Sequence, residues 1–147
     1  MIPVLFESPH AAIIQWLPTV LELPWLAEAS LTRADLQVRR VTPNERPRLF
    51  VLFVQQPGGR RINEVHKLAR FGVQCWATFA DGTLDYDSRE KLTAEVMFHL
   101  EQARIAAPQI SAVTDSNGSY PVVDPSGVEF NYSTIEYQLR GAAVQSN

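Results

Sequence analysis

The sequence predicts an α+β fold with a mostly antiparallel sheet, two main helices and a long β-hairpin arm. Helical and strand-like patterns follow one another in the order helix, strand, hairpin, helix, strand, strand. Short connections between successive strands favour antiparallel pairing. The 147 residues fit a single domain, residues 1–147. A chain of this size buries about 68–70% of its unfolded surface, which is enough for a core of its own.

The first helix is predicted to begin at Ser8 and Pro9. Serine is a good N-cap, and proline suits the first helical position because that N–H has no partner within the helix. Pro18 predicts a kink or a restart, since proline cannot donate the backbone hydrogen bond. Residues 23–33 are expected to form an irregular connection. One apolar face recurs at helical spacing: Ile13, Ile14, Leu17, Val20 and Leu21.

Three strand patterns come next. Residues 35–42 alternate in polarity, which predicts a half-exposed strand near a sheet edge, and residues 43–47 form a loop made rigid by two prolines. Residues 49–54 are six consecutive apolar residues, which predicts a central strand covered on both faces. Residues 67–78 predict the next strand. Its expected apolar face consists of Phe71, Val73, Cys75 and Ala77.

The strands at 49–54 and 67–78 are predicted to form a long hairpin. Its polar arm, residues 55–64, protrudes beyond the core. The run Gly58-Gly59-Arg60-Arg61 has the composition of a turn. Arginine binds phosphate well, so an anion-binding loop is the alternative. The Walker pattern, however, needs a following Lys-Ser/Thr and a helix, whereas a strand follows here. We therefore expect a hairpin tip with exposed arginines, and a contact of that tip with a protein or a nucleic acid is the alternative.

The second half of the chain is predicted to continue with a turn at residues 80–83 and a helix. Asp87 and Glu90 have the spacing of a capping box, which places the helix start at Asp87. Residues 109–115 are a candidate strand and residues 115–127 are loop-like. The helix is expected to bury a stripe of Leu92, Val96, Leu100 and Ala103, with Met97 beside it.

Residues 128–140 predict the last strand. Its first apolar residues have even numbers and its later ones odd numbers, which suggests a bulge near Ser133. Residues 141–147 are expected to be a frayed tail. The strand at 49–54 requires cover on both of its faces. Either the two helices lie on opposite sides of the sheet, or another subunit supplies the second cover.

Composition and charge exclude several classes of protein. Apolar residues make up 46% of the chain and charged residues 20%, which is not the composition of a disordered chain. A net charge of −3 argues against a duplex-binding face. One cysteine, Cys75, excludes an internal disulfide framework and a cysteine-rich zinc site. No apolar run approaches the ~20 residues that cross a bilayer, and the start lacks a secretory pattern. We expect a protein made in a reducing cytoplasm, with no membrane association.

Residues 79–84, Phe-Ala-Asp-Gly-Thr-Leu, resemble the haloacid-dehalogenase phosphatase signature. In that family an aspartate stands where this chain has Phe79, and that aspartate attacks phosphorus. A phenyl ring cannot do so, and the motif also stands too far from the start of the chain. We therefore favour a polar turn between a strand and a helix.

Four acidic residues, Asp81, Asp85, Asp87 and Glu90, crowd ten positions and could hold a hard cation. Their spacing is not that of an EF-hand. Acidic residues before a helix complement the positive end of its macrodipole, and this is the interpretation that we favour. The three histidines, His10, His66 and His99, form no recognised metal motif. Cys75 could pair with a histidine as a nucleophile, but its place in the strand favours a buried, inert thiol. We expect no catalytic residue, no metal and no cofactor.

The layout of residues 10–140 resembles the tail terminator (head–tail neck) proteins of long-tailed bacteriophages, especially those that infect actinobacteria. The resemblance rests on an opening helix with Trp16-Leu17, a strand ending Arg40-Val41-Thr42-Pro43, and the run 46–51 leading into a Gly-Gly-Arg turn. The segment Ala-Arg-Phe-Gly-Val-Gln-Cys-Trp-Ala at 69–77, a helix and a closing tyrosine-rich strand complete it.

The resemblance implies a non-catalytic subunit that forms a hexameric ring on the last ring of tail-tube protein. Its partners would be other copies of itself, the tail-tube protein and the head-completion (stopper) protein of the neck. DNA would pass through the ring without sequence-specific binding. The protein would be made in the host bacterial cytoplasm and located at the head–tail neck of the virion.

The arm and the loop at 115–127 are the candidate contact surfaces in this interpretation. Two alternative functions, each from another class of protein, stay open. One is a small phosphate-handling hydrolase that uses the acids from Asp81 to Glu90, and the other is a non-viral binding module. The candidate interface residues are Gln55, Gln56, Arg60, Arg61, Asn63, Glu64, Tyr120 and Asp124.

Overall fold

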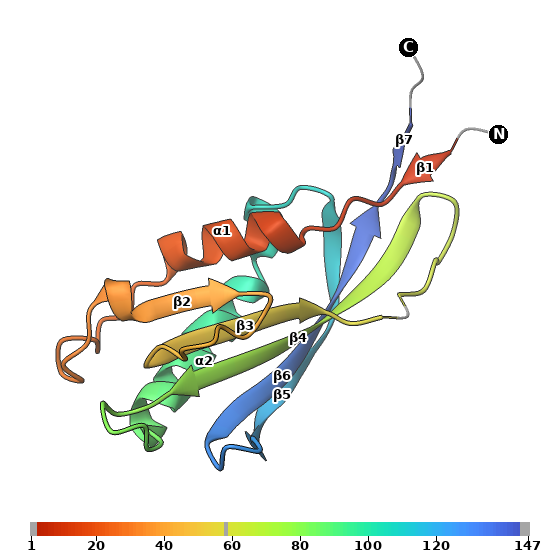
Figure 1. The fold of residues 1–147 in the computed structure, drawn as a ribbon. Helices are drawn as coiled ribbons and strands as arrows, with labels where there is room; N and C mark the ends of the chain where they lie inside the picture. Colours follow the sequence, from red (N-terminus) through yellow and green to blue (C-terminus); the bar gives the residue numbers. More distant parts are fainter. Residues whose placement is uncertain (1–2, 58, 145–147) are drawn as a thin grey trace.

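The computed structural model of the chain describes residues 3–57 and 59–144 and contains one five-stranded sheet, in the order β2-β3-β4-β6-β5 (Figure 1). A separate two-stranded sheet joins β1 to β7. The elements are β1 (Val4–Leu5), α1 (His10–Val20), η1 (Arg33–Asp35), β2 (Leu36–Arg39), β3 (Leu49–Gln55), β4 (His66–Ala77), α2 (Tyr86–Leu100), η2 (Ala103–Ile105), β5 (Ile110–Val123), β6 (Glu129–Arg140) and β7 (Ala142–Ala143).

The main sheet is mostly antiparallel, as predicted, and mixed. Strands β3, β4, β6 and β5 pair antiparallel in that order. The edge strand β2 instead runs parallel to β3, with Leu36 opposite Leu49, so the expected antiparallel pairing of successive strands is wrong there. The connection of residues 40–48 is long enough for the chain to run back along β2, so that β3 begins beside the first residue of β2. A tight hairpin would have reversed the chain instead.

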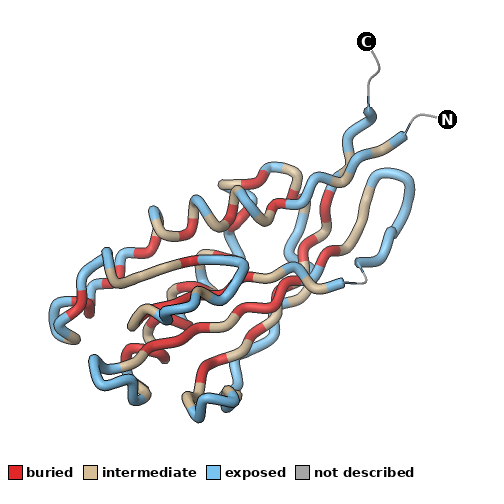
Figure 2. Tube along the Cα trace, in the orientation of Figure 1, coloured by how far each residue is buried: buried red, intermediate tan, exposed pale blue. Residues whose placement is uncertain are grey.

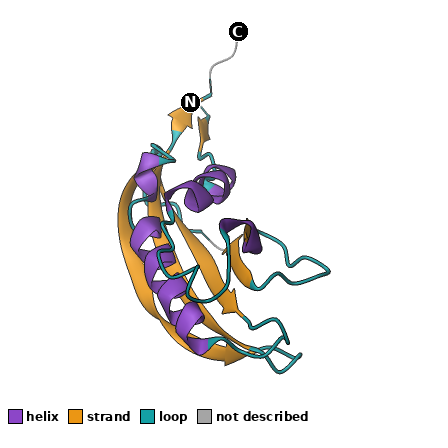
Figure 3. Cartoon of the chain, turned by 90° about the vertical axis from the view of Figure 1, so that its left-hand side faces the viewer, coloured by secondary structure: helices purple, strands orange, loops and turns teal. Residues whose placement is uncertain are grey.

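Both helices lie on the same face of the curved sheet (Figure 3). The alternative of helices on opposite sides is therefore wrong. Between the helices and the sheet lies the main core, in which every odd-numbered residue of Leu49–Phe53 and of Ala69–Ala77 is buried (Figure 2). The predicted apolar face of β4 is thus confirmed. So is the predicted buried stripe, formed by Leu92, Val96 and Leu100 of α2 and by Ala103 of η2.

The two helices begin at positions other than those predicted. In α1, Pro9 is the N-cap residue and the first helical residue is His10, while Ser8 Oγ donates to Gln55. The helix continues through Pro18 and ends at Val20, without a restart. In α2, no capping box starts the helix at Asp87.

Asp85 is the N-cap of α2. Its Oδ1 accepts from Ser88 N at 3.1 Å and its Oδ2 accepts from Ser88 Oγ at 2.7 Å. The side chain of Asp87 lies outside the cap and pairs with Lys91 Nζ at 2.8 Å. The sequence pattern misplaced the cap because Asp85 and Asp87 are both suitable residue types. Only the position of Ser88 above the carboxylate distinguishes them.

The segment of residues 115–127, expected to be a loop, is mostly strand. β5 spans fourteen residues and pairs with β6 across three register shifts, between 110 and 112, 113 and 115, and 117 and 120. The shift between 117 and 120 lies opposite Ser133, since Asn117 pairs with Thr134 and Tyr120 with Tyr132. The irregularity predicted near Ser133 is therefore present in the pairing with β5, while the pairing of β4 with β6 is continuous there. The change of parity in β6 has another cause: Phe130 packs on one face of the sheet, whereas Ile135 and Tyr137 pack on the other.

The C-terminal segment is paired with the N-terminal one. In the β1–β7 sheet, Val4 lies opposite Ala143 and Leu5 opposite Ala142. The expected frayed tail is therefore wrong for residues 141–144, and residues 145–147 lie outside the described part of the chain. A Cβ on Gly141 would clash with the side chains of Val4 and Phe6, so a larger residue at this position would displace the N-terminal segment.

A buried guanidinium ties α2 to β6. Arg89 is only 2% exposed, and it donates to Glu129 Oε1 at 2.8 Å and to Glu90 Oε1 at 2.9 Å. Glu90 Oε1 also accepts from Asn131 Nδ2 at 3.0 Å. The Asn131 bond, followed by those from Arg89, holds the pKa of Glu90 below its ordinary value. This polar cluster lies beneath the N-terminal half of α2, where the sequence predicted no buried charge.

Candidate protein-interaction surface

The predicted arm, residues 55–64, begins inside the sheet and ends in a turn beyond it. Gln55 is the last residue of β3, and its Oε1 accepts a hydrogen bond from Ser8 Oγ at 2.8 Å. The backbone N–H of Gln56 still donates to β4 at 2.8 Å. These two glutamines therefore anchor the arm, and its protruding tip consists of residues 60–66.

Local hydrogen bonds fix the shape of the tip. Arg61 Nε donates to Asn63 O at 2.9 Å, and its Nη2 donates to Glu64 O at 2.8 Å. Asn63 Oδ1 in turn accepts the backbone N–H groups of residues 65–66, each at 2.9 Å. Arg61 is thus used by the turn itself. Arg60 is exposed and forms no ion pair with another residue that the structure describes.

The tip and the paired chain ends form one extension at one end of the molecule (Figure 1). Gly141 N donates to Val65 O at 2.7 Å, and the Arg61 guanidinium lies 5.5 Å from the centre of the Phe6 ring. We call residues 3–7, 59–67 and 140–144 the projection. It carries four basic residues against two acidic ones. Its exposed apolar side chains are Leu5, Ile62, Val65 and Val144.

The sheet face opposite the helices, which we call the outer face, holds a second apolar cluster. Trp76 stacks on Phe130 with ring centres 4.3 Å apart, and Phe50 and Leu52 pack beside them. The guanidinium of Arg46, from the β2–β3 connection, lies 4.0 Å from the centre of the Trp76 ring. The predicted two-sided burial of β3 is therefore confirmed, although a loop rather than a helix covers this side.

Tyr120 and Asp124 both lie on this side of the sheet. Tyr120 is exposed and contacts Tyr132 with ring centres 5.6 Å apart. Asp124 lies 3.8 Å from Arg46, and it accepts two hydrogen bonds from Ser126 that hold the pKa of its carboxyl below the ordinary value. The loop residue Asp124 therefore helps to keep the arginine over the outer cluster.

The structure divides the predicted interface residues into two groups, and Gln55, which bonds to Ser8, belongs to neither. Arg60, Arg61, Asn63 and Glu64 lie on the projection. Gln56 joins Tyr120 on the outer face, because its Nε2 donates to the hydroxyl of Tyr132, which contacts the Tyr120 ring. A hollow of ≈ 210 Å³ lies at this point, with Gly72 and Tyr132 in its lining.

Sequence reasoning missed Tyr132, Arg46 and Trp76 as parts of the outer face. A signal for Tyr132 was present, since Phe130 and Tyr132 have the parity opposite to the core residues of β6. That parity was interpreted as a bulge. Nothing in the sequence indicates that Arg46 lies over Trp76, because the two residues are thirty positions apart.

The four acids from Asp81 to Glu90 do not converge. Asp85 caps α2, Asp87 pairs with Lys91, and Glu90 binds Arg89 and Asn131. Asp81 closes the predicted turn by accepting from Thr83 N at 3.0 Å and Thr83 Oγ1 at 2.6 Å, which lowers the pKa of its carboxyl. Within residues 3–57 and 59–144, no three His, Cys, Asp or Glu side chains are placed to hold a metal ion.

Cys75 is buried, as predicted, and burial raises the pKa of its thiol to about 12. His10 contacts the rings of Phe53 and Phe71 and bonds to Phe53 O, while His66 bonds to Asn63 at the arm. His99 lies on α2, so the histidines belong to different parts of the fold.

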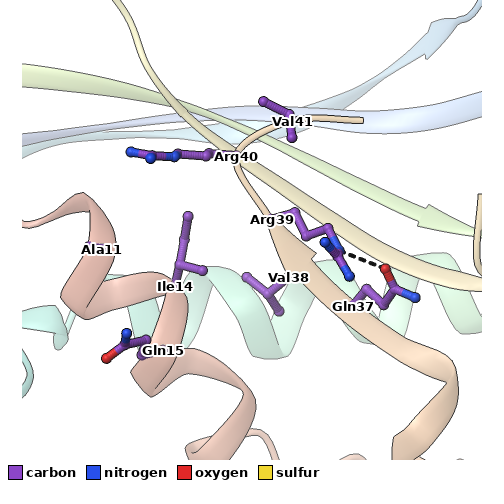
Figure 4. Close-up of a pocket in the computed structure, with 8 residues that line it drawn as sticks. All are labelled: Ala11, Ile14, Gln15, Gln37, Val38, Arg39, Arg40 and Val41. Carbon is purple, nitrogen blue, oxygen red and sulfur yellow. Dashed lines mark hydrogen bonds between the residues drawn. The ribbon is translucent and has the colours of Figure 1, made fainter. Parts of the chain in front are cut away.

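A groove of ≈ 460 Å³ runs between α1 and β2 (Figure 4). Its apolar lining comes from Ile14 and Val38, and Arg39 at its side donates to Gln37 Oε1 at 2.7 Å. The opening lies at the edge of the sheet that β2 forms. It therefore offers a shallow contact surface next to a short edge strand.

Comparison with known proteins gives no family for the chain. No protein-family model matches it, and no curated protein matches it significantly. None of the helices in the described residues has the length and apolar character needed to span a bilayer.

Proposed function

We propose that this chain is a structural virion protein that caps the tail tube of a long-tailed bacteriophage as a ring. The ring, expected to be a hexamer, ends tube polymerisation and provides the surface that joins the tail to the head. Its partners are further copies of the chain, the tail-tube protein and the stopper protein of the neck. DNA passes through the lumen, for which a net charge of −3 is better suited than a basic surface.

One observation carries this proposal: both helices cover one face of a sheet whose other face is also apolar. Phe50, Trp76 and Phe130 are buried on the outer face, where Arg46 lies over Trp76, and Tyr132 beside them is half-buried. Tyrosine and tryptophan supply large contact area at protein interfaces. A sheet with apolar side chains beyond its own helices is suited to a subunit that contacts neighbours on several sides.

The mechanism is one of shape and needs no chemical step. A ring subunit uses two different patches, one for each neighbour, and the ring closes when the rotation between copies closes. The outer face and the projection are separate surfaces that differ in composition. The proposed subunit uses such surfaces to match the end of the tube on one side of the ring, while its other side accepts no further tube subunit.

Two experiments test the proposal. Deletion of the gene from its phage should give lysates with overlong tails and tails unattached to heads, visible by negative-stain electron microscopy. Expression of the gene from a plasmid should restore normal particles. The purified protein should also shorten tubes when it is added to polymerising tail-tube protein. Tails of normal length joined to heads in the deletion lysate would overturn the proposal.

An enzymatic assay distinguishes the proposed structural function from the alternative, a phosphate-handling hydrolase. Phosphatase and nuclease activities measured with magnesium, on the wild-type chain and on Asp81→Asn, should both be at background. Asp81 is the suitable position because its carboxylate is at the surface and serves only the turn. Activity that disappears in Asp81→Asn would favour the phosphate-handling alternative.

A further inference from the structure

The end of the molecule opposite the projection carries an apolar groove with acidic sides. Two adjoining hollows, of ≈ 410 and ≈ 340 Å³, lie between residues 24–29 and the N-terminal half of α2. They share Trp25, Glu28 and Lys91 in their linings. Ala94 lies at one end and Phe79, which is half exposed, at the other. We call this surface the acidic groove.

The groove is built on rigid contacts. Glu95 of α2 accepts from Trp25 Nε1 and from Leu23 N, each at 3.2 Å, and so fixes the position of the 23–31 turns on the helix. Leu23 has a φ of 51°, a left-handed conformation that a leucine adopts only when its surroundings hold it. The residues that line the groove are therefore held in place within the single chain.

Negative charge dominates this surface. Glu28, Asp85, Asp87 and Glu95 stand against a single cation, Lys91. The hydrogen bond that the Lys91 ammonium donates to Asp87, and then the charges of Asp87, Glu28 and Asp85, raise the pKa of Lys91. The excess of carboxylates is the opposite of the excess of basic residues on the projection.

The projection has the matching chemistry. Ile62 and Val65 are 46% and 44% exposed on a tip whose shape is fixed by Arg61. Arg60 stands beside them with its guanidinium in solvent. A preformed apolar tip loses little conformational freedom on binding, and opposite charges at its rim favour encounter and register.

We propose that the projection of one copy of this chain docks in the acidic groove of the next copy. Ile62 and Val65 contact the Trp25 side of the groove, and Arg60 pairs with Glu28 or Asp87. The two surfaces lie at opposite ends of one chain (Figure 1), so the contact is heterologous and propagates from copy to copy. The inference rests on the proposed function in taking a closed ring as the product, and it adds which two surfaces meet.

Site-specific cross-linking tests the contact directly. The native Cys75 is buried with a raised pKa, so introduced cysteines are the reactive ones. A mixture of Ile62→Cys and Ala94→Cys chains, treated with a short bis-maleimide, should give covalent dimers. A mixture of Ile62→Cys with Ala112→Cys, an exposed residue of β5 away from the groove, is the matched control and should not. The double variant Ile62→Cys/Ala94→Cys should give a ladder that stops at the number of subunits in the ring.

Charge reversal gives a second readout. Arg60→Glu should weaken self-association by about tenfold or more in analytical ultracentrifugation, because like charges then face each other across the contact. Glu28→Arg in the same chain should restore most of the loss. Circular dichroism should be unchanged, and so should thermal unfolding at a concentration where the chains are monomeric, since both side chains are exposed.

The outcomes separate this contact from the proposed function. Equal cross-linking in the Ala94 and Ala112 mixtures, or none in either, overturns the docking inference even if the protein still shortens tail tubes. A specific Ile62–Ala94 cross-link in a protein whose deletion leaves tails normal supports the docking and overturns the phage function. Unchanged association of Arg60→Glu also overturns the docking.

Discussion

Replacing Arg89 with alanine should lower the free energy of unfolding by about 3 kcal/mol. The guanidinium is 2% exposed and donates to Glu129 at 2.8 Å and to Glu90 at 2.9 Å. Removing one partner of a buried ion pair costs about 3–5 kcal/mol, because the remaining charge is left without compensation. Here the two carboxylates keep 35% and 43% of their side-chain surface exposed, so water solvates them in part. The low end of the range is therefore expected.

Urea unfolding followed by circular dichroism measures this loss. With a slope of about 2 kcal/mol/M, a loss of 3 kcal/mol moves the midpoint down by about 1.5 M. The melting temperature should fall by about 6–12 °C for a chain of this length. Arg89→Met is the matched control, since it keeps the aliphatic volume and removes the charge together with the unpartnered Nε.

Arg89→Met combined with Glu90→Gln and Glu129→Gln should be closer to the wild type than Arg89→Ala. Buried ion pairs are often replaced by neutral groups of similar size with little loss. A loss below 1 kcal/mol in Arg89→Ala would refute the reasoning, because the cluster would then contribute nothing to the attachment of α2. A triple variant as unstable as Arg89→Ala would show that volume or geometry, rather than the uncompensated carboxylates, causes the loss.

Three further predictions concern other contacts. Cys75 should react with iodoacetamide at pH 8 only through unfolding, since burial raises its thiol pKa to about 12; rapid labelling of the native chain, seen by mass spectrometry, would contradict this. Gly72→Ala should lower the free energy of unfolding in urea by about 1–3 kcal/mol, because the new Cβ would lie 2.8 Å from the Tyr132 hydroxyl. In a Tyr132→Phe background most of this loss should disappear. An equal loss in both backgrounds would disprove the close contact. Glu90 has a pKa lowered on folding, chiefly by Asn131, so its ionised form stabilises the fold above its ordinary value of 4.5, and this stabilisation is lost as the pH falls through the lower folded value. Glu90→Gln should therefore flatten the decline in stability between neutral and acid pH, and an identical decline in both proteins would count against it.

The candidate surface could be predicted only in part. The Gly-Gly-Arg-Arg composition indicated the arm, because turn residues between two apolar strands leave few other conformations for the chain. The partners of the arm could not be predicted. Phe6 and Gly141 reach the tip from the two ends of the sequence, and their pairing depends on where the sheet places the termini.

The sequence by itself determined the elements that are buried by their own side chains. The apolar run 49–54, the alternation in 69–77 and the stripe of α2 each bury a face, and burial leaves a periodic signal in the residues. Only the tertiary structure decided that the strand predicted at 109–115 continues to Val123 as β5. Most of its residues are exposed, so no alternation marks it, and backbone hydrogen bonds to β6 hold it in place.

The tertiary structure also decided that β2 runs parallel to β3 and that both helices lie on one face. An apolar strand requires cover but does not specify its source, since burial against a helix and burial under a loop favour the same side chains. The direction and side of each connection depend on the whole sheet, and no local stretch of residues encodes them.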